Sequence, residues 1–231
     1  MICALFRALP AGSSGKPSNG TRLAVLAADQ MNCTSARGFS LMEMLMALAV
    51  MGVLAAIALP MMSNALKYEK ISGDARDISN DISVAKMRAA AKFTQARIYA
   101  DLSGNQYRLQ TCNDPTTLPC LAWTTENNWV GLSSTTSFGF GSVSSAPSNT
   151  QTTIGQATLC KDGSPLADVA NSACVIFNSR GIPVDPSGAP TGGYALYIND
   201  GNFCYGVTVA ATGFIRTWRT NLTTTPTWVL Q

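Results

Sequence analysis

The sequence predicts an α+β fold in which a long N-terminal helix, its first half transmembrane, packs on antiparallel β-sheets. Three observations predict this. No residue from Met44 to Leu66 is charged, apolar residues then recur at alternating four- and three-residue steps from Ile71 to Ala89, and short alternating runs separated by turn residues follow residue 97. The second pattern is typical of one face of a helix and the third of β-strands.

Composition argues against catalysis. The chain has 231 residues and a formal charge of +3, which resides in residues 1–38, so that the rest is neutral and indicates neither a nucleic-acid nor an acidic partner. There is no histidine, which removes Ser-His-Asp and Cys-His pairs and most zinc sites. No glycine-rich phosphate loop or nucleophile motif occurs either. We therefore predict no enzyme activity, no catalytic residue, no cofactor and no metal site.

The uncharged run from Met44 to Leu66 is long enough to cross a bilayer as a helix. Arg37 precedes it and the next basic residue is Lys67, so the positive-inside rule places the N-terminus in the cytoplasm. A cleaved secretory signal peptide and a plain anchor are the competing interpretations. Glu43 argues against both, because a carboxylate in the apolar region costs several kcal/mol unless it is paired or neutralised.

The segment Gly38-Phe39-Ser40-Leu41-Met42-Glu43, followed by an apolar helix that contains Pro60, resembles the N-terminal signal of type IV pilins and type II secretion pseudopilins. The resemblance implies that prepilin peptidase cuts between Gly38 and Phe39 and methylates the new amine of Phe39. Glu43 and Pro60 then become the fifth and the twenty-second mature residues. Glu43 would neutralise the Phe39 amine of an adjacent subunit, and Pro60 would allow a kink or local melting.

This resemblance implies a single-pass protein of the bacterial inner membrane, with a periplasmic C-terminal domain, that joins a filament of other pilin or pseudopilin subunits. We expect a leader over residues 1–38, a transmembrane half-helix over 39–66, a helical stem over 67–95 and an exported β-rich domain over 96–231. A 38-residue leader is long for the family. We therefore expect Met31 to be the initiator, with residues 1–30 left untranslated.

Within the outer domain, Arg97–Leu102 and Gln106–Thr111 flank a Ser-Gly-Asn turn and predict a β-hairpin. Residues 112–129 are expected to form a loop. A buried strand is predicted at Cys174–Asn178, with a turn at 179–181. The strongest hairpin pattern comes last, and its members are Tyr194–Ile198, the turn 199–202 and Phe203–Ala210, before a final strand at Gly213–Thr220.

The C-terminal third also resembles the minor pseudopilin GspH/FimT group, in the runs Phe177–Gly181, Tyr194–Ile198 and Val207–Arg219. This resemblance implies two antiparallel sheets against a long helix and a low-copy role near the filament tip.

Five of the seven cysteines lie in the Gly-, Ser- and Thr-rich outer domain, which indicates an oxidising compartment. Spacing alone leaves fifteen arrangements of two bridges among five cysteines. We favour Cys112–Cys120 and Cys160–Cys174, since each closes a short loop. Buried reduced thiols are the alternative.

Two functions follow. The first is a structural minor subunit that initiates or caps a filament. The rival is DNA capture, with phosphate contacts from Arg180, Arg216 and Arg219 and a stacking surface at Trp218. A solvated strand face is the alternative for these arginines, and three of them in a neutral mature chain make a thin electrostatic footprint.

Overall fold

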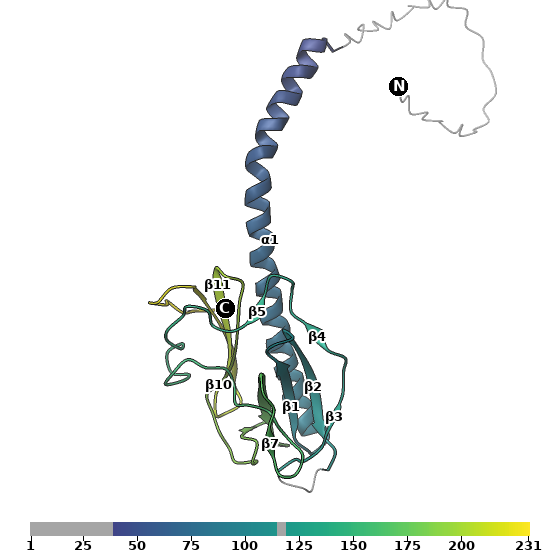
Figure 1. Ribbon diagram of the computed structural model, residues 1–231, viewed down its shortest axis with the longest axis vertical. Coiled ribbons are helices and arrows are strands. Elements are labelled where there is room, and N and C mark those ends of the chain that lie inside the picture. Colours follow the sequence, from purple (N-terminus) through teal and green to yellow (C-terminus); the bar gives the residue numbers. More distant parts are fainter. Residues whose placement is uncertain (1–38, 115–118) are drawn as a thin grey trace, which may run out of the picture. The chain divides into compact units, whose positions relative to one another are not determined.

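The computed structural model describes residues 39–114 and 119–231, and within these it contains one helix followed by thirteen strands (Figure 1). The chain divides into two compact units, Met1–Leu48 and Ala49–Gln231. Only the start of the helix represents the first unit among the described residues, whereas the second unit holds the rest of the helix and every strand. The predicted α+β class, with a long N-terminal helix and antiparallel sheets, is confirmed.

Helix α1 spans Leu41–Ala91. In its second half it presents one fully buried face, made of Ile71, Ala75, Ile78, Ile82, Ala85 and Ala89. These are the residues that the four- and three-residue spacing predicts, because such steps follow the 3.6-residue helical repeat along one side. A left-handed residue, Phe93 (φ 52°), follows the end of the helix, and the N–H of Thr94 donates to the carbonyl of Ala89 at 3.1 Å. That arrangement satisfies a terminal carbonyl of the helix.

The first sheet has the strand order β3-β2-β1-β8-β9, with β4 also paired to β2 and every pair antiparallel. Its strands are β1 (Ala96–Asp101), β2 (Gln106–Cys112), β3 (Trp123–Thr125), β4 (Val130–Gly131), β8 (Ser172–Phe177) and β9 (Pro183–Val184). The predicted β1–β2 hairpin is confirmed. Its turn is closed by the Asp101 carboxylate, which accepts the N–H groups of Ser103 and Gly104 at 3.1 and 3.0 Å.

The predicted loop over residues 112–129 is wrong at one point, because Trp123–Thr125 forms β3 and pairs with β2. Three residues are too few to show an alternating pattern in the sequence. They pair with β2 in the folded sheet, and the Arg97 guanidinium lies 4.1 Å from the centre of the Trp123 ring. The neighbouring residues 115–118 lie outside the described part of the chain.

The second sheet has the order β13-β12-β11-β10-β5 and is also antiparallel. Its strands are β5 (Ser137–Phe138), β10 (Tyr194–Asn199), β11 (Phe203–Val209), β12 (Ile215–Asn221) and β13 (Val229–Leu230). The predicted hairpin between β10 and β11 is confirmed, and the Asp200 carboxylate closes its turn by accepting the N–H groups of Asn202 and Phe203. The predicted last strand is present as β12, shifted by one or two residues because Gly213 (φ 75°) belongs to the preceding turn.

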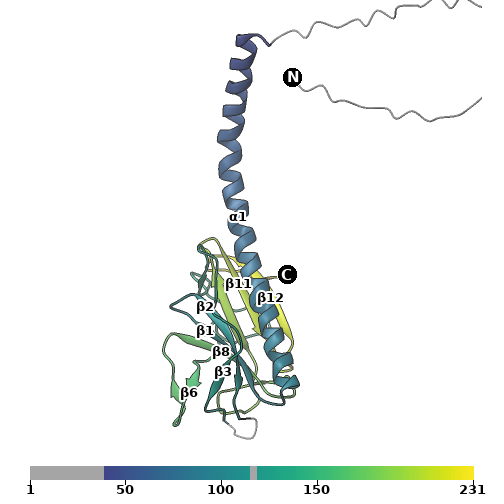
Figure 2. The same ribbon diagram turned by 90° about the vertical axis from the view of Figure 1, so that its right-hand side faces the viewer.

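Both sheets bury one face against α1, so that helix and sheets share one core (Figure 2). The sheet side of this core comes from alternate residues of five strands: Ile98 and Ala100 of β1, Tyr107 and Leu109 of β2, Val175 and Phe177 of β8, Leu196 and Ile198 of β10, and Tyr205, Val207 and Val209 of β11. A smaller cluster, with Val143, Ala195, Tyr197 and Cys204, lies on the other side of the second sheet.

On its outer side, the first sheet carries an interleaved stack of arginine and aromatic side chains. The Arg97 guanidinium lies over the rings of Trp123 and Tyr99, at 4.1 and 5.4 Å from their centres, and the Arg108 guanidinium lies over Tyr99 and Trp129, at 5.4 and 4.2 Å. Each such contact contributes roughly 0.5–2 kcal/mol. This stack, Trp123-Arg97-Tyr99-Arg108-Trp129, joins strands β1, β2 and β3.

A two-stranded hairpin, β6 (Lys161–Asp162) with β7 (Ala167–Asp168), covers part of this stack. Arg97 holds it in place by donating to the carbonyl of Lys161 at 3.0 Å and to the carboxylate of Asp162 at 2.6 Å. The disulfide between Cys160 and Cys174 ties the start of the same hairpin to β8. The hairpin is therefore fixed by one covalent and one ionic contact.

Candidate functional site

The head of α1 carries the residues that the pilin resemblance singles out. Phe39 precedes the helix and is 77% exposed. Glu43 lies in the first helical turn, is exposed, and takes part in none of the ion pairs among the described residues. A carboxylate there interacts favourably with the helix dipole. Among the described residues, the charge of Glu43 has no ion-pair partner, so the carboxylate is available to a group from another molecule.

The same part of the helix is apolar on all sides. Leu41–Ala58 has a mean hydropathy of 2.3, none of it is buried, and by length and composition it is able to cross a membrane. Among the side chains that the structure describes, the large ones between Leu41 and Leu66 are more than half exposed. Exposed apolar surface on this scale marks a region that contacts lipid or other protein.

Other predicted features of the N-terminal segment are only partly described. Gly38, Met31 and the rest of the leader, residues 1–38, lie outside the described residues. Pro60 lies within α1, and the helical backbone continues through it. The boundaries of the transmembrane half-helix and the stem remain predictions.

The structure contains two disulfides, Cys112–Cys120 and Cys160–Cys174, which are the two pairs that the spacing favours. The fifth cysteine of the outer domain, Cys204, is a fully buried free thiol. Burial raises the pKa of this thiol to about 12, so it stays protonated and unreactive. Among the described residues there is no group of three or more His, Cys, Asp or Glu side chains that could hold a metal ion.

The four residues predicted to contact DNA do not form one surface. Arg216 and Trp218 lie on the outer face of β12, whereas Arg219 lies on the face that meets the helix, since successive residues of a strand point to opposite sides. Arg219 donates to the hydroxyl of Tyr68 in α1 at 2.7 Å. The turn that holds Arg180 lies beside the Lys86 side chain of α1 and next to Gly213, in the turn that precedes β12.

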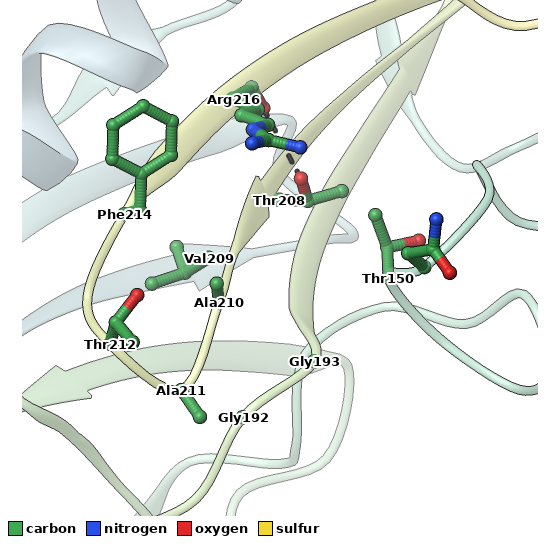
Figure 3. Close-up of a pocket in the computed structure, with 11 residues that line it drawn as sticks. Thr150, Gly192, Gly193, Thr208, Val209, Ala210, Ala211, Thr212, Phe214 and Arg216 are labelled. Atoms are coloured by element: carbon green, nitrogen blue, oxygen red, sulfur yellow. Dashed lines mark hydrogen bonds between the residues drawn. The ribbon is translucent and has the colours of Figure 1, made fainter.

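Arg216 lines a pocket of about 470 Å³ between the β11–β12 turn, the start of β10 and the loop at Asn149 and Thr150 (Figure 3). It is the one charged residue in the lining, and its guanidinium lies 5.2 Å from the centre of the Phe214 ring. Trp218 is half-buried, and its indole N–H donates to Thr208 at 3.0 Å. The predicted stacking surface is thus largely engaged within the protein.

Two structural residues escape prediction from the sequence. Arg97 is 1% exposed and donates to Gln110 as well as to the β6–β7 hairpin. Tyr68 receives Arg219 from a strand 151 residues away. The position of Tyr68, two residues after the uncharged run ends, is the signal that could have marked it, because aromatic residues gather at membrane interfaces.

Comparison with known proteins supports the assignment of the N-terminus. Residues 33–59 match the prokaryotic N-terminal methylation motif. No curated protein and no solved structure matches the chain. The motif indicates a type IV pilin-like protein that is processed by prepilin peptidase, and it covers the predicted cleavage site, Phe39 and Glu43.

Proposed function

We propose that the chain is a minor pilin or pseudopilin, cut by prepilin peptidase between Gly38 and Phe39 and then assembled into a type IV pilus or a type II secretion pseudopilus. The observation that carries this proposal is the methylation motif at residues 33–59, together with the position of Glu43, which has no ion-pair partner among the described residues, at the head of an exposed apolar helix. The looser GspH/FimT resemblance of the C-terminal third supports a place at or near the tip, where the subunit would initiate the filament.

The chemistry of the helix head explains why cleavage precedes assembly. Hydrolysis of the Gly38–Phe39 bond creates an α-amine on Phe39, with a typical pKa of about 7.7–8.0, so most of it is protonated at pH 7. Methylation keeps this positive charge. In an apolar environment, the amine of one subunit and Glu43 of its neighbour stabilise each other far more than they would in water. The pair therefore favours subunits that are packed side by side.

DNA capture, the rival function, receives less support from the geometry. Arg219 faces the helix, Trp218 is half-buried, and only Arg180 and Arg216 are exposed. Two exposed arginines can contact few phosphates, and affinity for DNA depends mainly on the number of phosphates neutralised. The structural role therefore stands as the proposal.

The proposal is tested by replacing Glu43→Gln in cells that assemble the filament. We expect normal cleavage of the leader but at least about a tenfold loss of the subunit from sheared filaments, because an ion pair in an apolar environment contributes more than about 1.4 kcal/mol. Immunoblots of the sheared and the membrane fractions measure both effects. Glu69→Gln, in the exposed part of the stem, is the matched control. Normal incorporation of the Glu43→Gln subunit would contradict the proposal.

A further inference from the structure

The side chain of Arg219 lies against two aromatic rings at one end of the outer domain. Its Nη1 donates to the Tyr68 hydroxyl at 2.7 Å, and its guanidinium lies 5.5 Å and 5.8 Å from the ring centres of Tyr68 and Phe203. These two rings meet edge to face at 5.7 Å. The guanidinium is thus fixed in position without being enclosed, since Arg219 remains half-buried.

The charge of Arg219 is not neutralised by an ion pair with any described residue. The nearest loop contains Asp200, whose carboxylate accepts the backbone N–H groups of Asn202 and Phe203 at 2.8 and 2.7 Å. Lys67 adds a second positive charge, because it lines a cavity of about 310 Å³ with Tyr68, Asp200, Asn202 and Phe203. Two cations therefore lie at the same end of the domain.

The uncharged run of the chain ends just before this site. Residues 39–66, which precede Lys67, contain Glu43 as their sole charged residue, and such a run is long enough to cross a bilayer as a helix. Lys67 is the first charged residue after the run and Tyr68 follows it, at the position where a membrane-spanning segment reaches the headgroup layer.

We infer that Arg219, positioned by Tyr68 and assisted by Lys67, binds the phosphate of an anionic phospholipid while the subunit is in the membrane, before assembly. The inference rests on the proposed membrane-inserted precursor. A guanidinium and an ammonium group donate charge-assisted hydrogen bonds to phosphate oxygens, and aromatic residues such as Tyr68 and Phe203 favour the interface. The contact orients the outer domain on the membrane surface before assembly, and extraction into the filament breaks it.

The experiment counts lipids retained by the full chain. The protein is purified in detergent and titrated with phosphatidylglycerol, and bound lipid is measured by native mass spectrometry. Arg219→Gln should weaken retention about fivefold, since one cation near an anionic surface is worth about that factor. Lys67→Gln should lower it by a similar factor without touching the aromatic pair. Arg216→Gln, on the opposite face of the same strand, should leave it unchanged.

Two further probes identify the source of the phosphate. Phosphatidylcholine should bind more weakly than phosphatidylglycerol, and inorganic phosphate at millimolar concentration should not displace the lipid. Equal retention by wild type, Arg219→Gln and Lys67→Gln would overturn the inference, as would equal binding of both lipids or displacement by inorganic phosphate. The lipid count needs neither leader cleavage nor filament assembly, so its outcome is independent of the Glu43 experiment.

Discussion

Arg97 shows how a single residue can hold three elements together. Its guanidinium is buried between the Trp123 and Tyr99 rings and donates to Gln110, Lys161 and Asp162. Burial lowers the pKa of Arg97, and the hydrogen bond that Arg97 donates to Asp162 opposes that shift. The ion pair is asymmetric, since the side chain of Arg97 is 1% exposed and that of Asp162 is 47% exposed. The stabilisation that this ion pair provides therefore depends mainly on Arg97, its buried partner.

We predict that Arg97→Ala lowers the free energy of unfolding by about 2–4 kcal/mol, because it leaves Gln110 without its donor and removes the stacking partner of Trp123. Urea unfolding of the full chain in detergent, followed by tryptophan fluorescence, measures the change. Arg216→Ala removes an exposed arginine and should cost less than about 0.5 kcal/mol. Similar losses in both variants would show that Arg97 contributes no more than a surface residue.

Residues differ in how well their contacts can be predicted from the sequence. Short spacing points to Cys112–Cys120 and Cys160–Cys174, because the two partners are 8 and 14 residues apart and few other pairs are so close. The sequence does not predict the contact between Arg97 and Asp162, since Asp162 is 65 residues away and both are residue types usually found on the surface. Patterns among neighbouring residues predict only contacts that are close in the sequence. A buried charge with distant partners is determined by the tertiary structure.

At the scale of elements, periodicity carries most of the predictable information. The buried face of the stem and the hairpins β1–β2 and β10–β11 all follow from residue patterns or turn chemistry. Strands of two or three residues, such as β3 and β13, contain too few alternations to be detected. They form because an adjacent longer strand offers free backbone groups, which is a property of the folded sheet and not of the segment itself.

The stem is predicted to be the main apolar contribution of α1 to the core. Ile82→Ala should lower the free energy of unfolding by about 2–5 kcal/mol, because it removes a fully buried side chain from the interface with both sheets. Met87→Ala, at a residue 61% exposed on the same helix, is the control and should cost less than about 1 kcal/mol. Chemical unfolding of both variants in the same detergent gives the comparison. A small effect at Ile82 would mean that the helix contributes little to the stability of the domain.

At the scale of the whole molecule, the alternation of side chains along a strand determines which charged residues lie on the same surface. Arg216 and Arg219 are three residues apart, so β12 places them on opposite faces, and each contacts a different part of the domain. The sequence already implies this separation once β12 is recognised. It does not reveal that Arg219 meets Tyr68, because that contact depends on how the second sheet packs on α1.

The last prediction concerns the leader, whose removal sets the start of the mature chain. Gly38→Glu should abolish cleavage, because the methylation motif at residues 33–59 implies a peptidase that acts after this glycine. In wild-type cells, intact mass spectrometry should find a mature chain that begins with methylated Phe39, and in the variant a chain that keeps its leader. The retained leader also reports the start of translation, since initiation at Met31 leaves eight residues and initiation at Met1 leaves 38. Gly52→Ala, a conservative change within the apolar helix, is the matched control and should be processed normally. An unchanged mature mass in the Gly38→Glu variant would remove the assignment of this site, whereas a chain that retains its leader but still enters filaments would separate assembly from the Phe39 amine.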